Sequence, residues 1–251
     1  MSEVVVRKDP EAVARQAATW IVRWARAAVA ERGQFRIALA GGGTPARLYE
    51  LLAREPYRSI LPVAQTEVFW GDERFLPHGN AGRNDTHVLP LLSEAGIPGQ
   101  NINPVPYVAE TSDKSCADSR LARSAHLYEK QLQTRLEPGH PLMDVILLGL
   151  GTDGHTASLF PDTAALSVTD HLVAPNRSAY EDRHPERITL TFPAINASRI
   201  ILFMVTGRGK RDILRRVLDT PESPVLPAQL VAPTSGNLLW LADEAATSSV
   251  L

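Results

Sequence analysis

The sequence lacks three features that would place it in a specialised class: paired cysteines, a large net charge and a long hydrophobic run. Its only cysteine is Cys116, which excludes an intramolecular disulfide and a cysteine-based zinc cluster. The formal net charge is −2, so a general attraction to nucleic acid or to an anionic membrane is not expected. No hydrophobic run approaches the ~20 residues of a membrane span, and residues 1–7 lack the layout of a signal peptide. We therefore expect a cytoplasmic protein that binds neither nucleic acid nor membranes.

Several catalytic motifs are also missing. The sequence has no HExxH, no CxxC and no carboxylate cluster of the metal-binding type, so we expect no metal site. It has no GxSxG motif, which argues against a serine esterase. The phosphate-binding motif GxxxxGK[ST] and the dinucleotide motif GxGxxG are absent too, so a nucleotide is not indicated.

The residues that are present predict an α/β protein. A content of 44% hydrophobic and 22% charged residues is typical of a soluble globular protein. Asp9 as N-cap, Pro10 in the first turn and Gly33 as the stop predict a helix that ends at Arg32. Further helices are expected at residues 45–52, 84–92, 114–136 and 210–218, and strands at 35–40, 66–70, 145–148, 171–174, 187–192, 200–205 and 238–241.

This alternation of strands and helices predicts the architecture. It favours a three-layer sandwich with a mostly parallel, Rossmann-like sheet and helices on both faces. The connections are too short to mark a boundary, so we expect residues 1–251 to form a single domain.

A glycine-rich turn follows the first of these strands. The run GGGTP at residues 41–45 joins a strand to a helix. Glycines let the backbone approach a ligand closely, and the amides of a helix N-terminus favour an anion. The pattern fits an anion site in which Thr44 gives its hydroxyl to a phosphate. It fits equally a tight turn in which Thr44 caps the helix.

The most informative stretch is GLGTDGHTASLFP at residues 149–161, which follows a buried strand. It brings Asp153 and His155 to the carboxyl end of a strand, where open α/β sheets bind their ligands. A carboxylate beside an imidazole positions the ring and raises its basicity, which suits a general base near neutral pH. The alternative is a glycine-rich connection with an Asp cap and a solvated histidine.

Other strand ends carry charged residues. Asp72 and Arg74 follow the strand at residues 66–70, where Asp72 suits a hydroxyl or a catalytic group and Arg74 a phosphate. Arg187 opens a strand and Lys210 opens a helix, so each is a candidate cation for a dianionic phosphate. A surface salt-bridge network or solvated cations would explain the same residues.

Together these segments resemble the 6-phosphogluconolactonase family, in the same order along nearly the whole chain. The run from Gly149 to Pro161 carries the resemblance most specifically. The other matching segments are residues 40–45, 70–74, 84–85, 187–191, 207–210, 224–228 and 239–243. The resemblance implies hydrolysis of 6-phospho-D-glucono-1,5-lactone to 6-phosphogluconate in the oxidative pentose phosphate pathway. It implies neither a metal nor an organic cofactor, and we expect a monomer or a weak homodimer.

The resemblance also implies roles for individual residues. His155 would take the proton from the attacking water, and either Asp153 or Asp72 would orient its ring. Arg74 would bind phosphate or stabilise the developing oxyanion. The groups that would hold the phosphate are the amides of Gly42 and Gly43 and the side chains of Thr44, Arg187 and Lys210.

The sequence departs from the family pattern at two places. Ala40 stands where a serine is common, and the approach to Arg187 is unusually charged, which leaves open whether Arg187 or Arg183 faces the ligand. We prefer Arg187, because the strand that it opens fixes its direction.

Two other functions compete with the lactonase. An amino-sugar-phosphate isomerase or deaminase on the same fold would need a carboxylate base near the histidine, and residues 156–161 contain no glutamate. A sugar-phosphate sensor without catalysis would need the glycines and cations but not an activated imidazole.

Overall fold

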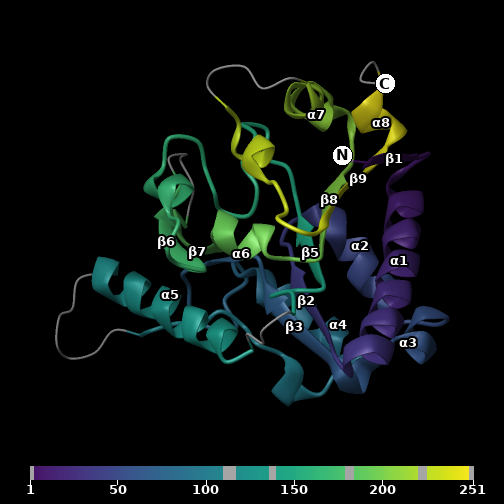
Figure 1. The fold of residues 1–251 in the computed structure, drawn as a ribbon, viewed down its shortest axis with the longest axis horizontal. Helices are drawn as coiled ribbons and strands as arrows, with labels where there is room; N and C mark the ends of the chain where they lie inside the picture. The colour runs from purple at the N-terminus through teal and green to yellow at the C-terminus, as the bar shows by residue number, and fades with distance from the viewer. Residues whose placement is uncertain (1–2, 110–116, 136–139, 179–183, 220–224, 249–251) are drawn as a thin grey trace.

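The computed structural model describes residues 3–109, 117–135, 140–178, 184–219 and 225–248 (Figure 1). Its strands are β1 Glu3–Arg7, β2 Phe35–Leu39, β3 Thr66–Trp70, β4 Asp72–Arg74, β5 Val145–Leu148, β6 Val173–Arg177, β7 Glu186–Leu190, β8 Ile200–Val205 and β9 Asn237–Asp243. Its α-helices are α1 Pro10–Arg32, α2 Gly43–Leu52, α3 Tyr57–Ile60, α4 Asn84–Ala95, α5 Ala117–Gln133, α6 Phe192–Asn196, α7 Arg211–Leu218 and α8 Glu244–Thr247. Short 3-10 helices lie at Val63–Gln65, Gly99–Asn101, Ala164–Ser167, Arg208–Lys210 and Pro227–Leu230.

The main sheet has six strands in the order β1-β9-β8-β5-β2-β3. Every pair of neighbours in it is parallel. All residues of β2, β5 and β8 are buried, as expected for strands that are covered on both faces. The predicted α/β class with a mostly parallel sheet is confirmed.

Helices cover both faces of this sheet, as predicted (Figure 1). On one side α1 packs against α2 and the strands β2 and β9, and α2 contacts α4. On the other side lie α5 and α6 with a small second sheet. The predicted ends of α1 are confirmed. The Asp9 side chain accepts a hydrogen bond from the Ala12 N–H at 2.8 Å, and Gly33 ends the helix with φ 77°.

The second sheet differs from the prediction of a single sheet. It is antiparallel, with the order β4-β7-β6, and it contains the two strands expected near residues 171–174 and 187–192. Only residues 178–185 separate β6 from β7. This connection is too short for the crossover that parallel strands need, so the two strands form an antiparallel pair.

Gly71 joins the two sheets. Its N–H donates to the carbonyl of Leu39 in β2 at 2.9 Å, and its carbonyl accepts the N–H of Leu190 in β7 at 2.8 Å. The chain therefore leaves the main sheet at Trp70 and enters the small sheet at Asp72. This single-residue step places β4 directly at the carboxyl end of β3.

Some local predictions were wrong. Helix α2 begins at Gly43 with Gly42 as its N-cap and has no side-chain cap, so Thr44 does not cap it. Helix α4 extends to Ala95, beyond the predicted end at Leu92. Strand β1 was not predicted, and Phe192 belongs to α6 instead of the preceding strand. Among the described residues, no helix is long and apolar enough to cross a membrane.

Candidate active site

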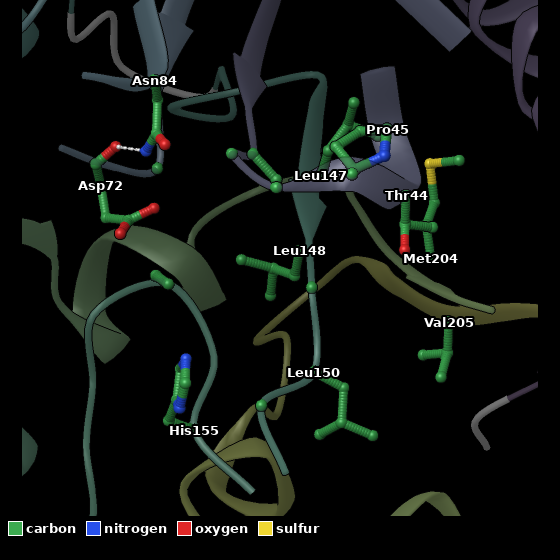
Figure 2. A pocket seen from close by; sticks show the side chains of 18 of the residues that line it. Thr44, Pro45, Asp72, Asn84, Leu147, Leu148, Leu150, His155, Met204 and Val205 are labelled. Atoms are coloured by element: carbon green, nitrogen blue, oxygen red, sulfur yellow. Dashed lines mark hydrogen bonds between the residues drawn. The ribbon is translucent and has the colours of Figure 1, made fainter. Parts of the chain in front are cut away.

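A pocket of about 390 Å³ lies at the carboxyl end of the main sheet. Its walls are built from the segments that follow β2, β3, β5 and β8. The predicted site residues that line it are Gly42, Gly43, Thr44, Asp72, Arg74, His155 and Lys210. Figure 2 shows His155 and Asp72 on one side of this pocket and Thr44 on the other. Ligands of open α/β sheets bind at this edge.

The turn after β2 forms one wall. Gly42 has φ 92°, a conformation that favours glycine, and the first turn of α2 starts at Gly43. The amides of this helix N-terminus therefore border the pocket and favour an anion. The hydroxyl of Thr44 lies 3.1 Å from that of Thr206, which follows β8 and was not singled out from the sequence.

Two buried tyrosines hold the ends of β2 and β3. The Tyr49 hydroxyl donates to the Ala40 carbonyl at 2.7 Å and accepts the Ala40 N–H at 3.1 Å. The Tyr128 hydroxyl contacts the carbonyl and the N–H of Trp70 in the same way, both at 2.8 Å. Burial raises the pKa of both phenols, so both remain protonated donors. These bonds fix the points at which the two pocket loops begin.

Asn84 connects the turn after β2 with the segment after β3. Its Nδ2 donates to the Asp72 carbonyl at 3.0 Å, the bond drawn in Figure 2. Its side chain also packs against Gly41, where a Cβ atom would lie 2.1 Å from Asn84 Oδ1. The glycine at position 41 is therefore required by this close approach.

Glu73 caps the N-terminus of α4 from a fully buried position. Its carboxylate accepts the N–H groups of Arg74 at 2.8 Å, Asn84 at 2.7 Å and Asp85 at 2.9 Å. Burial raises the pKa of Glu73 to about 7, although these hydrogen bonds and the charge of Arg83 act in the opposite direction. Through these hydrogen bonds, Glu73 holds the backbone of Asn84 and Arg74, which both line the pocket.

The raised pKa predicts a pH-dependent stability. The pKa of Glu73 in the folded protein lies above the usual value of 4.5 for a glutamate, so the unfolded chain loses this proton first as the pH rises. The contribution of Glu73 to stability is therefore present below about pH 4.5 and is lost as the pH approaches 7, by roughly 3 kcal/mol. In urea titrations across this pH range, the free energy of unfolding of Glu73→Gln should decline less with rising pH than that of the wild type. Identical pH profiles for wild type and variant would contradict the prediction.

The loop after β5 brings Asp153 and His155 together. Asp153 Oδ1 lies 2.6 Å from His155 Nδ1, and the His155 ring packs against Phe160 with 4.7 Å between ring centroids. A Cβ atom at Gly151 would lie 2.1 Å from His155 Nδ1 and 2.5 Å from Asp153 Oδ1. The glycine at position 151 thus leaves room for the pair, and the His155 side chain remains 30% exposed toward the pocket.

Asp72 does not contact His155 through a hydrogen bond in the described part of the chain. Its Oδ2 instead accepts a hydrogen bond from the Ser158 hydroxyl at 2.6 Å. Of the two carboxylates expected to orient His155, Asp153 is therefore the one bonded to the imidazole. Asp72 lines the pocket as a separate acceptor.

Of the predicted cations, Lys210 and Arg74 line the pocket. Lys210 Nζ donates to the Leu150 carbonyl at 2.6 Å, and burial lowers its pKa against the opposing charge of Asp153. Arg74 donates to the Gly82 carbonyl at 2.8 Å and, like Lys210, lines the pocket.

Arg187 is placed differently. It pairs with Arg74 in the register of β4 and β7, but it is only 4% exposed and is not among the described residues that line the pocket. Its Nη1 donates to the Glu186 carbonyl at 3.2 Å. Arg183, the alternative cation, lies outside the described residues. In the described part of the chain, no three His, Cys, Asp or Glu side chains are grouped as a metal ion would require.

A protein-family model matches residues 8–240, and its description is "Glucosamine-6-phosphate isomerases/6-phosphogluconolactonase". The chain belongs to this family. Within the family, it is 42% identical over 224 residues to a 6-phosphogluconolactonase from Synechocystis, covering 87% of this chain and 86% of the relative. It is 36% identical over 228 residues to the 6-phosphogluconolactonase of Homo sapiens, covering 86% of this chain and 80% of the relative.

Solved structures of family members have the same fold. The 6-phosphogluconolactonase from Trypanosoma brucei superposes with a TM-score of 0.88 at 26% identity, over 100% of this chain and 99% of that one. The 6-phosphogluconolactonase from Thermotoga maritima superposes with a TM-score of 0.77 at 27% identity, over 97% of this chain and 100% of that one. The family and fold that the sequence motifs predicted are thus confirmed.

Proposed function

We propose that this chain hydrolyses 6-phospho-D-glucono-1,5-lactone to 6-phosphogluconate, with His155 as the general base. The observation that carries the proposal is the Asp153–His155 pair, with 2.6 Å between carboxylate and ring nitrogen, at the wall of a pocket that also contains a helix N-terminus. The 6-phosphogluconolactonase relatives at 42% and 36% identity support the same reaction.

The chemistry assigned to His155 follows from this pair. Hydrogen bonding to Asp153 holds the Nδ1 proton on the carboxylate side, which leaves the Nε2 lone pair for a water molecule. His155 takes a proton from that water, and the resulting hydroxide attacks the lactone carbonyl. When the tetrahedral intermediate collapses, the bond to the ring oxygen breaks and the imidazolium returns its proton to that oxygen. Atoms and charge balance with one water consumed.

The remaining pocket residues are assigned to binding. The amides of Gly42 and Gly43, the hydroxyl of Thr44 and the ammonium group of Lys210 hold the phosphate. Arg74 stabilises the negative charge that develops on the carbonyl oxygen. No substrate contact is assigned to Arg187, because it is not among the described residues that line the pocket.

Phosphate recognition provides the first test of this assignment. Binding energy from the remote phosphate holds the carbonyl near His155, so the phosphorylated lactone should have a kcat/KM at least about 100-fold above that of glucono-1,5-lactone. Both rates are measured as proton release, after subtraction of the spontaneous opening. Equal values for the two lactones would contradict a phosphate site in this pocket.

Replacing Lys210 tests the phosphate site at one residue. Lys210→Ala removes a charged donor from the pocket, so we expect KM to rise by roughly 10- to 100-fold and inhibition by free phosphate to weaken. Lys130→Ala, at an exposed position on α5, serves as the matched control. Unchanged KM together with unchanged phosphate inhibition would remove Lys210 from the binding scheme.

A further inference from the structure

Ser158 is held by one residue from each strand of the small sheet. Its N–H donates to Thr189 Oγ1 of β7 at 3.2 Å, and its carbonyl accepts from Asn176 Nδ2 of β6 at 2.7 Å. Its hydroxyl donates to Asp72 Oδ2 of β4 at 2.6 Å. Ser158 is 1% exposed and lies three residues after His155. The small sheet therefore fixes the end of the loop that carries the imidazole.

The hydrogen bond from Ser158 also determines which oxygen of Asp72 is left to accept a hydrogen bond from a ligand. It is the only hydrogen bond that the Asp72 side chain makes within the part of the chain that the structure describes. Because Oδ2 is engaged by Ser158, Oδ1 remains as the acceptor for a ligand. Figure 2 shows this carboxylate on the same side of the pocket as His155 and opposite Thr44.

An ionised carboxylate accepts hydrogen bonds and donates none, so the ligand group beside it must be a donor. On the proposed function, the phosphate lies toward Thr44 and the lactone carbonyl lies toward His155. The donors nearest to that carbonyl are the hydroxyl groups of the sugar ring. Of these, the hydroxyl on the carbon next to the carbonyl is the closest to the reacting centre.

We propose that Ser158 is a positioning residue that holds Asp72 as the acceptor for the substrate hydroxyl adjacent to the lactone carbonyl. The inference rests on the proposed function and adds a specificity determinant to it. Ser158 acts through Asp72 and touches no substrate itself. The pair selects lactones that carry this hydroxyl, because its loss leaves a carboxylate oxygen unpaired in the pocket.

The test compares two substrates, 6-phosphogluconolactone and its 2-deoxy analogue. The preference of an enzyme is the ratio of the two kcat/KM values, and this ratio does not depend on the fraction of folded protein. Wild type should prefer the hydroxylated lactone by at least about 10-fold, and Ser158→Ala should lose most of this preference. The backbone bonds of Ser158 to Thr189 and Asn176 remain possible in this variant.

A double-mutant cycle shows whether Ser158 works through Asp72. Asp72→Ala should abolish the preference, and adding Ser158→Ala to it should change the ratio little. Ser124→Ala is the matched control, since Ser124 is also fully buried and its hydroxyl accepts one hydrogen bond, from the Val108 N–H at 3.0 Å. This control should keep the wild-type preference.

The outcomes separate the inference from the proposed function. A wild-type preference retained in Ser158→Ala, or equal losses of preference from Ser158→Ala in the wild-type and Asp72→Ala backgrounds, would overturn the role of Ser158. A wild type without preference for the hydroxylated lactone would overturn the role of Asp72 as hydroxyl acceptor. A wild type that accelerates the opening of neither lactone would instead refute the proposed function.

Discussion

Replacing His155 by alanine is expected to lower kcat by roughly 10²–10⁴, the usual contribution of general base catalysis, with little change in KM. The side chain lines the pocket, and its Nδ1 is bonded to Asp153. Without the imidazole no group remains at this position to take the proton from water. Substrate binding should persist, because the proposed phosphate contacts lie on other segments.

The measurement is proton release from the lactone, with the spontaneous opening subtracted. His126→Ala is a suitable control, since His126 is an exposed histidine on α5, away from the pocket. It should retain wild-type kcat. If His155→Ala also retained most of its kcat, His155 would have no part in the mechanism.

Replacing Asp153 by asparagine is expected to lower kcat to a similar extent, by about 10²–10⁴. The amide has nearly the same shape but carries no charge, so it neither stabilises the imidazolium nor holds the Nδ1 proton in place. The loss should be equal for 6-phosphogluconolactone and its 2-deoxy analogue, because Asp153 acts on His155 rather than on a substrate hydroxyl.

Asp72→Asn is the matched comparison, since it makes the same chemical change in the other carboxylate. We expect it to alter chiefly the preference between the two lactones. The opposite pattern, near-normal kcat in Asp153→Asn and an equal loss for both lactones in Asp72→Asn, would show that Asp72 orients the imidazole.

Much of the fold could be predicted because its signals are local. The strands β3, β5 and β8 coincide with the strands predicted at residues 66–70, 145–148 and 200–205. Helix α1 has the predicted ends because Asp9 and Gly33 determine them through the backbone next to them. The strand ends carried the glycines and charged residues that line the pocket, so His155 and Lys210 could be singled out from the sequence.

The parts that could not be predicted depend on contacts between distant segments. Ser158 and Asp72 are 86 positions apart, and nothing near Ser158 indicates its partner. The hydrogen bonds from Tyr49 and Tyr128 to strand ends could not be predicted either, since nothing in the sequence distinguishes these tyrosines from other buried core residues.

The small sheet also determines where Arg187 lies, while its role in phosphate binding stays a prediction. From the sequence, Arg187 was expected to face the ligand because the strand that it opens fixes its direction. Because β7 pairs with β4 and β6 in a separate antiparallel sheet, Arg187 is buried beside Arg74 instead of lining the pocket. Two expectations stay predictions: that residues 1–251 form a single domain, and that the protein is a monomer or a weak homodimer.

We expect this family member to open a phosphorylated lactone and not to act as a deaminase on the same fold. Asp72 is the only carboxylate among the described residues that line the pocket, and no glutamate is among them. The decisive measurement is proton release from enzymatically generated 6-phosphogluconolactone with and without the protein, beside an assay for ammonia from glucosamine-6-phosphate. The expected result is fast lactone opening and no ammonia. Ammonia release without accelerated lactone opening would contradict it.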